Sequence, residues 1–186
     1  MRSLPMLAFA LLVPLGPLAA HADPVVWSGT GNAGYLLVHK FHEVEGKSTK
    51  IQTKAVWDGD QIKVQARGLV DSFVSGDASR DAHMLEVMEA EKFPFVMIRG
   101  VIGGVAVPTG ALKVDTTLKA DVELHGQTVS KDVPVTLDFA DPTHVTVSFS
   151  FPESLEGHGI ERPSLLFVKV DDDIKITGSI PMERKP

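Results

Sequence analysis

Residues 112–139 read LKVDTTLKADVELHGQTVSKDVPVTLDF, and apolar and polar residues alternate on both sides of a short turn. Within 112–124, one set of alternate residues is apolar except for Thr116, and the interleaved set is entirely polar. A period of two predicts a strand with one face in water. The tripeptide at 125–127 fits a turn, and the alternation resumes over 133–139. Because the connection is so short, we expect two neighbouring antiparallel strands.

The same alternation recurs along most of the chain. It predicts further strands at 26–30, 35–39, 51–57, 62–66, 96–101, 145–151 and 166–176, with the glycines of 29–34 as a turn and 171–173 turning the last hairpin. Eight or nine antiparallel strands fit a sandwich or a closed up-and-down barrel. The strand over 112–124 would be roughly 40 Å long at ~3.3 Å per residue, which favours a curled barrel.

One segment breaks the alternation. Residues 79–92 read SRDAHMLEVMEAEK, with Asp81 in a first helical turn, Lys92 in a last turn and Pro94 beyond it. These signals predict one short helix. The helix either covers one mouth of the barrel or is a plain connector that packs on a sheet.

Composition limits the classes of protein. The chain has 186 residues, 44% hydrophobic and 23% charged, which are values for one globular domain. Its formal net charge is -6 and it shows no Lys/Arg cluster, so a nucleic-acid-binding domain is disfavoured. The absence of cysteine excludes disulfides, cysteine nucleophiles and cysteine-ligated metal centres.

The first residues predict export. Arg2 precedes an apolar run over 4–18, and residues 20–22 form an Ala-His-Ala cleavage site. We expect 1–22 to be a signal peptide cleaved after Ala22, leaving a domain over 23–186. A secreted chain without cysteine fits a bacterial periplasm.

Motifs for nucleophilic, phosphate or zinc chemistry are missing from the sequence. The best metal candidates are His39 and His42, three residues apart, which would need His83, His125 or Glu43 to converge with them. If this stretch were helical the two histidines would share a face, whereas in a strand or turn the spacing places them on opposite faces. The acidic run at 171–173 fits a solvated turn better than a calcium loop.

Apolar side chains dominate one face of the predicted strands. If the barrel closes, this face points inward and lines either a ligand cavity or a filled core. Over 145–151, strict alternation predicts that Val147, Phe149 and Phe151 point inward and Thr146, Ser148 and Ser150 face water. The candidate lining residues are Trp57, Leu118, Val122, Phe139, Val147, Phe149 and Phe151.

Several segments in order resemble the YceI-like family of periplasmic, lipocalin-like, polyisoprenoid-binding proteins. The most specific is 75–94, with Arg80-Asp81-x-His83, a short helix and then Phe-Pro before a strand. Weaker likenesses lie at 39–46, 118–133 and 149–180. Departures from the family pattern, such as Met-Leu-Glu after His83, indicate a divergent branch.

The resemblance implies an extended antiparallel eight-stranded barrel with a helix beside it. It implies an apolar tunnel for an isoprenoid chain such as a quinone tail or polyprenol, with no catalytic residues, no cofactor and a plausible homodimer. Two alternatives stay open from the residues themselves. One is a metal-dependent enzyme using His39, His42 and His83; the other is a filled-core barrel that binds a protein partner.

Overall fold

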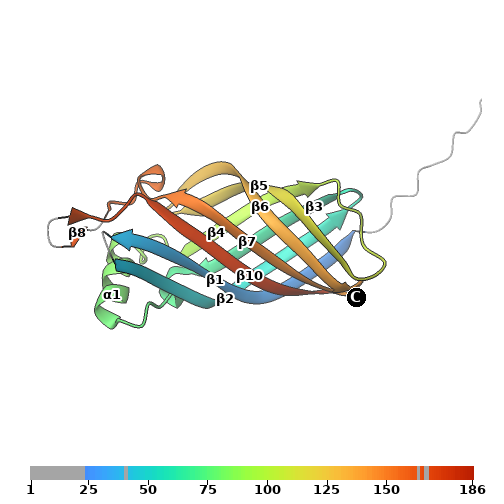
Figure 1. Ribbon diagram of the computed structural model, residues 1–186, viewed down its shortest axis with the longest axis horizontal. Helices are drawn as coiled ribbons and strands as arrows, with labels where there is room; N and C mark the ends of the chain where they lie inside the picture. The colour runs from blue at the N-terminus through green and yellow to red at the C-terminus, as the bar shows by residue number, and fades with distance from the viewer. Residues whose placement is uncertain (1–23, 40–41, 163, 166–167) are drawn as a thin grey trace, which may run out of the picture.

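The computed structural model describes residues 24–39, 42–162, 164–165 and 168–186. Eight long strands form a closed antiparallel barrel in the order β1-β10-β7-β6-β5-β4-β3-β2. Figure 1 shows the start of β1 and the C-terminus at one end of this barrel, with helix α1 (Ala78–Val87) and β8 (Ser164–Leu165) at the other. The barrel strands are β1 (Val25–His39), β2 (His42–Asp58), β3 (Gln61–Leu69), β4 (Phe95–Gly103), β5 (Leu112–Leu124), β6 (Gln127–Asp141), β7 (His144–Ser154) and β10 (Asp173–Arg184).

The predicted eight-stranded barrel is therefore confirmed, and the strand predicted over 112–124 has the same bounds as β5. In the β5–β6 pair, Leu118 lies opposite Val133, and both side chains are buried. The intervening Lys119 and Asp132 are exposed. One dry and one wet face per strand is what the alternation encodes.

The first prediction that fails is the turn at 29–34, because β1 is one continuous strand with a bulge between Gly31 and Ala33. The glycines serve close packing between strands. A Cβ on Gly29 would collide with the carbonyl of Pro181 on β10, and one on Gly31 would lie 2.5 Å from the Ile180 Cα. Glycine here allows the two strands to approach closely.

Helix α1 (Ala78–Val87) is shorter than the predicted 79–92. Asp77 caps it, since its Oδ1 accepts a hydrogen bond from the Arg80 amide at 3.0 Å. The helix ends where Glu89 adopts a left-handed conformation with φ 44°. In the described part of the chain, no helix has the length and apolar character to cross a membrane.

The hairpin predicted over 166–176 is also wrong. Within the described residues, the two-residue strands β8 (Ser164–Leu165) and β9 (Val168–Lys169) pair with each other, whereas β10 begins at Asp173 and pairs with β1 and β7. The acidic run is not a hairpin turn. Asp172 instead accepts hydrogen bonds from the Ser154 hydroxyl at 2.6 Å and the Glu156 amide at 2.8 Å, which fix the chain after β7 and the 3₁₀ turn η2 (Glu156–His158).

Aromatic side chains fill the end of the barrel away from α1. Trp27 and Phe139 meet edge to face with ring centroids 6.0 Å apart, and Trp57 lies 5.8 Å from Phe139. The Trp57 indole donates a 2.8 Å hydrogen bond to the carbonyl of Val105, which lies in the loop between β4 and β5. Half of the barrel interior is therefore filled by side chains, and any space for a ligand must lie in the other half.

Candidate functional site

A cavity of about 830 Å³ occupies the half of the barrel next to α1. Its wall comes from all eight barrel strands except β6, from the segments that follow β3 and β7, and from α1 itself. Most lining side chains are apolar, including Phe149 and Phe151 of β7 and Val122 of β5. Cavities of this size and character suit drug-sized or larger apolar ligands.

Helix α1 covers the open end of this cavity. Met84, Val87 and Met88 line it, and Val87 and Met88 pack against a buried cluster that includes Leu155 and Ile160. No residue of α1 is itself fully buried. The helix therefore lies at the mouth of the barrel, with apolar side chains in the cavity wall.

The motif residues Arg80, Asp81 and His83 all lie on this covering helix. Asp81 accepts hydrogen bonds from the amide and hydroxyl of Ser75 at 2.8 and 2.6 Å, which fixes the entry to the helix. Arg80 and His83 line the cavity at its rim. Arg80 lies 3.7 Å from Asp77, while His83 lies 3.5 Å from Glu86.

Tyr35 of β1 also lines the cavity and is half-buried. Its ring packs over Gly46 on β2, where any Cβ would collide with the ring, and lies 6.3 Å from the Phe73 ring. Burial raises the pKa of the Tyr35 hydroxyl above 10.0, the nearby Asp81 carboxylate raises it further, and Arg80 opposes the shift. The hydroxyl is thus a neutral hydrogen-bonding group beside the mouth.

The structure divides the predicted lining residues into two groups. Val122, Phe149 and Phe151 line the large cavity. A second cavity of about 60 Å³ lies among the packed aromatic side chains. The predicted residues that line this smaller cavity are Trp57, Leu118, Phe139, Val147 and, shared with the large one, Phe149.

The metal hypothesis requires His39, His42 and His83 to lie close together. His39 and His42 are opposite residues in the register of β1 and β2, so they belong to two paired strands and not to one helix. Their side chains lie outside the described part of the structure, and His83 is on α1. Among the described residues, no group of three or more His, Asp or Glu side chains could hold a metal.

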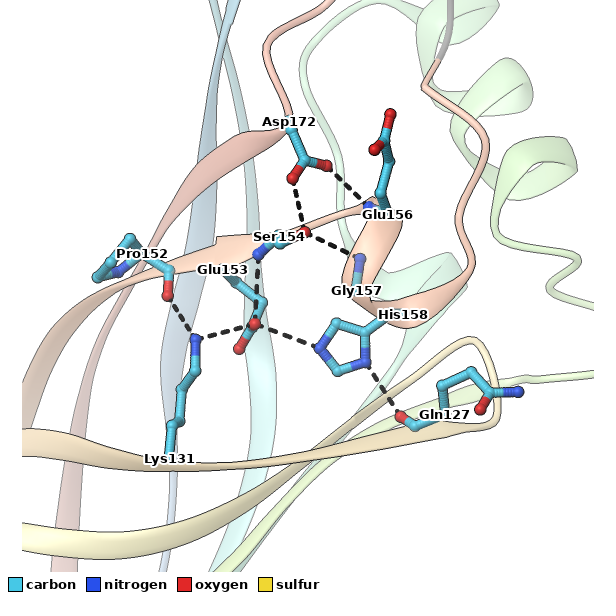
Figure 2. A network of polar contacts seen from close by, with 9 residues as sticks. All are labelled: Gln127, Lys131, Pro152, Glu153, Ser154, Glu156, Gly157, His158 and Asp172. Carbon is cyan, nitrogen blue, oxygen red and sulfur yellow. Dashed lines mark hydrogen bonds and ion pairs between the residues drawn. The ribbon is translucent and has the colours of Figure 1, made fainter.

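A polar network links the side chains of β6 and β7 (Figure 2). The paired register of these strands runs from Val135 and Phe149 to Asp141 and His144. Beyond it, Lys131 Nζ lies 2.9 Å from Glu153 Oε1 and donates a 2.8 Å hydrogen bond to the Pro152 carbonyl. Side chains thus join the two strands where the described ladder ends.

His158 completes this network from the 3₁₀ turn η2. It is fully buried, with Nε2 3.4 Å from Glu153 Oε1 and Nδ1 3.1 Å from the Gln127 carbonyl. Burial raises the pKa of Glu153, but the hydrogen bonds and charges of His158 and Lys131 outweigh it, so that the pKa lies below 4.5. Glu153 is therefore an ionised carboxylate inside the barrel wall.

A second contact fastens the covering helix to the barrel. His125, in the turn between β5 and β6, has Nε2 3.1 Å from Glu89 Oε1 just beyond α1. The Phe93 ring meets the His125 ring edge to face at 4.9 Å. Both Glu89 and His125 adopt left-handed conformations, with φ 44° and 50°. The segment that follows α1 therefore lies against the turn of the β5–β6 hairpin.

Sequence reasoning missed Lys131, Glu153, His158 and Tyr35. For the first two a signal existed. Lys131 continues the inward set of β6 that includes Val133, and Glu153 continues the inward set of β7 that includes Phe151. A charged residue at an inward position predicts a buried ionic partner. His158 and Tyr35 carried no comparable signal.

A family model, the YceI-like domain, matches residues 30–182. The chain belongs to the YceI-like family. No curated protein matched it in sequence. The match includes the segments at 39–46, 75–94, 118–133 and 149–180, on which the resemblance was based.

Solved structures share the YceI-like barrel at low sequence identity. A polyisoprenoid-binding domain from Saccharophagus degradans, implicated in plant cell wall breakdown, superposes with a TM-score of 0.68 at 11% identity, covering 86% of this chain and 98% of the other. Burkholderia cenocepacia BcnA gives 0.62 at 18%, covering 86% and 96%. The Campylobacter jejuni YCEI protein gives 0.58 at 14%, covering 97% and 100%. These likenesses support the fold.

Proposed function

We propose that this protein binds a long apolar amphiphile, such as an isoprenoid quinone or a polyprenol, and stores or carries it in the periplasm. The observation that carries the proposal is the 830 Å³ cavity with its largely apolar wall. Burying an apolar chain there would contribute roughly 25 cal/mol for each Å² removed from water. The polyisoprenoid-binding domain among the structural neighbours supports the ligand class.

Roles follow for the predicted site residues. Val122, Phe149 and Phe151 would contact the ligand chain, since they line the large cavity. Arg80, Asp81 and His83 would hold α1 over the mouth rather than perform chemistry. The remaining candidates, Trp57, Leu118, Phe139 and Val147, would form the packed floor beneath the ligand.

The proposal includes export, with residues 1–22 as the signal peptide and 23–186 as the mature domain. Expression of the full chain in a bacterium with an outer membrane tests this. We expect the protein in the periplasmic fraction with a mass that corresponds to cleavage after Ala22. An uncleaved chain retained in the cytoplasm would contradict it.

Native mass spectrometry of protein purified without detergent tests ligand binding directly. We expect a co-purifying lipid, and uptake of a quinone or polyprenol by refolded, lipid-free protein. The Phe149→Asp variant should lose uptake, because it places an unpaired carboxylate in the apolar cavity. Ser150→Asp is the matched control, because Ser150 is adjacent in β7 but exposed. If wild type binds neither the co-purifying lipid nor the added ligands, the proposal fails.

Separate measurements test the two alternative functions, a metal-dependent enzyme and a filled-core barrel that binds a protein partner. Elemental analysis that finds a stoichiometric metal, lost in a His39→Ala, His42→Ala double variant, would support a metal-dependent enzyme instead. A protein partner captured at equal stoichiometry by lipid-free protein would support the partner-binding barrel. We also propose that the protein forms the homodimer that the family resemblance implies, and sedimentation equilibrium should then give twice the mass of one chain.

A further inference from the structure

The large cavity ends inside the barrel, at a level marked by three side chains. Ala66 on β3, Ile98 on β4 and Phe149 on β7 line both the large cavity and the small one of about 60 Å³. These three residues therefore lie where the two spaces meet. On the far side of this boundary, the small cavity is surrounded by the packed aromatic side chains.

The boundary residues come from opposite sides of the barrel wall. Ala66 and Ile98 are direct partners in the β3–β4 register. In the closed strand order, β6, β5 and β4 separate β7 from β3 in one direction, and β10, β1 and β2 separate them in the other. Phe149 has by far the largest of the three side chains, and its ring lies over Gly178 on β10, where any Cβ would collide with it. Truncation of Phe149 is therefore the change that would join the two spaces.

The two ends of the large cavity differ in polarity. The small cavity at the inner end presents only apolar atoms, as far as the described residues form its wall. The mouth carries Tyr35, Arg80 and His83. An unpaired hydroxyl or charged group costs free energy when it is buried among apolar atoms. The end of an amphiphile that reaches Phe149 is therefore its apolar chain, and its polar end stays at the mouth.

A chain in this orientation has a limited length inside the barrel. Each methylene that enters the large cavity leaves water, which strengthens binding by about fourfold when the group is fully buried. Beyond the boundary the interior is close-packed, and a packed core does not accept extra atoms without strain. Once the chain end reaches the boundary, a further methylene can only remain in water at the mouth, and the gain in affinity stops.

We propose that Phe149, across the barrel from Ala66 and Ile98, ends the ligand site and limits the length of apolar chain that the protein encloses. This inference rests on the proposed function and adds a selection among amphiphiles by chain length. A shorter chain leaves part of the large cavity unfilled, and a longer chain extends out of the mouth. Phe149 is thus a specificity-determining residue as well as part of the cavity wall.

A series of linear alcohols from 1-octanol to 1-icosanol measures this limit. Affinity for lipid-free protein would be obtained by displacement of the fluorescent probe N-phenyl-1-naphthylamine. We expect wild type to bind each longer alcohol more tightly, by about fourfold per methylene, until the affinity levels off at one chain length, the break length. Self-association of the long alcohols is the same for every protein, so it cancels when a variant is compared with wild type.

Two substitutions should move the break length in opposite directions. Phe149→Ala should move it to longer chains by about two methylenes or more, because the small cavity of about 60 Å³ becomes accessible and a methylene takes roughly the 30 Å³ of one water in the liquid. Ala66→Leu adds a side chain at the same boundary and should move it to shorter chains. Since one variant removes volume and the other adds it, a folding defect in either leaves the other as a test.

Val114→Ala is the matched control. Val114 packs against the same core but, within the described part of the chain, lines neither cavity. This variant should keep the break length of wild type. A shift in Val114→Ala as large as that in Phe149→Ala would show a general loosening of the core and would overturn the inference.

Two further outcomes would also overturn it. A break length that is unchanged in both Phe149→Ala and Ala66→Leu would mean that another part of the wall limits the chain. An affinity of wild type that keeps rising through 1-icosanol would mean that the chain passes the boundary. Failure of wild type to bind the probe or any of the alcohols would instead count against the proposed function.

Discussion

Lys131 Nζ lies 2.9 Å from Glu153 Oε1, and this pair joins β6 to β7 beyond the last described register pair, Val135 and Phe149. The Glu153 side chain is 2% exposed and that of Lys131 is 24% exposed. Removing one member of a buried pair leaves the other charge without compensation, which costs more than removing both. A single substitution in this pair should therefore destabilise the barrel wall.

Lys131→Met should lower the free energy of unfolding by about 1–3 kcal/mol, because it leaves the buried Glu153 carboxylate with His158 as its remaining side-chain partner. The double variant Lys131→Met, Glu153→Leu should be much closer to wild type. Urea unfolding measures both. Lys63→Met is the control, since Lys63 and Asp58 form an exposed pair at 3.6 Å, and it should change stability by less than about 0.5 kcal/mol. Equal losses in the single and double variants would contradict the reasoning.

The same carboxylate predicts a pH dependence. The pKa of Glu153 is lower in the folded protein than the ordinary 4.5, so its ionised form contributes stability above about pH 4.5. That contribution is lost as the pH falls through the folded pKa. Glu153→Gln should therefore be less stable than wild type at pH 7, and the difference should shrink in acid. Urea midpoints from pH 7 to pH 2 measure it.

Asp141→Asn is the control for this titration. Hydrogen bonds from Thr143 and His144 lower the pKa of Asp141 from 3.8 to about 2 on the exposed surface. Its contribution should persist below pH 4 and disappear only as the pH approaches 2. If the difference between wild type and Glu153→Gln stayed constant down to pH 2, Glu153 would not be titrating as its contacts indicate.

How far the sequence predicts this molecule depends on what each pattern encodes. Alternation tells which side chains point inward, because each strand has one wet face, and it predicted the bounds of β5. It left a sandwich and a barrel open, and the prediction of an eight-stranded barrel also needed the strand length and the family resemblance. It does not tell how far along the barrel axis a side chain lies. That is why Phe139 and Phe149, both predicted to line one interior, belong to a packed half and an open half.

Contacts between distant strands were also hidden. In the sequence, Gly29 and Gly31 are typical of a turn. In the structure they are required because Pro181 and Ile180 of β10 occupy the space that their side chains would need. The end of α1 depends on His125, a residue far along the chain that pairs with Glu89. Neither relationship has a local signature.

Two phenylalanines should therefore respond differently to truncation. Phe139 is 1% exposed and packs against both tryptophans, so Phe139→Ala should cost about 3–5 kcal/mol. Phe149→Ala enlarges a cavity that already exists and should cost about half as much or less. The loss for Phe149→Ala should shrink further when lipid is extracted. Urea midpoints with and without lipid measure both variants.

A full core-sized loss for Phe149→Ala, the same with and without lipid, would contradict a ligand against this ring. It would favour a filled barrel in which Phe149 is an ordinary core residue. Losses of equal size for Phe139 and Phe149 would likewise remove the distinction between the packed and open halves.

Gly178→Ala should reduce ligand capacity without removing any contact residue. Gly178 on β10 lies opposite Phe149 in the register, and a Cβ there would collide with the Phe149 ring. The ring must then move into the cavity that it lines, so we expect weaker uptake of a long-chain ligand and a stability loss of about 1–3 kcal/mol. Gly103→Ala is the matched control, because a Cβ at that strand position meets nothing within 4 Å. It should leave uptake unchanged and alter stability by about 0.5 kcal/mol at most. Unaltered uptake by Gly178→Ala, with the ring shown to have moved, would mean that the ligand does not reach Phe149.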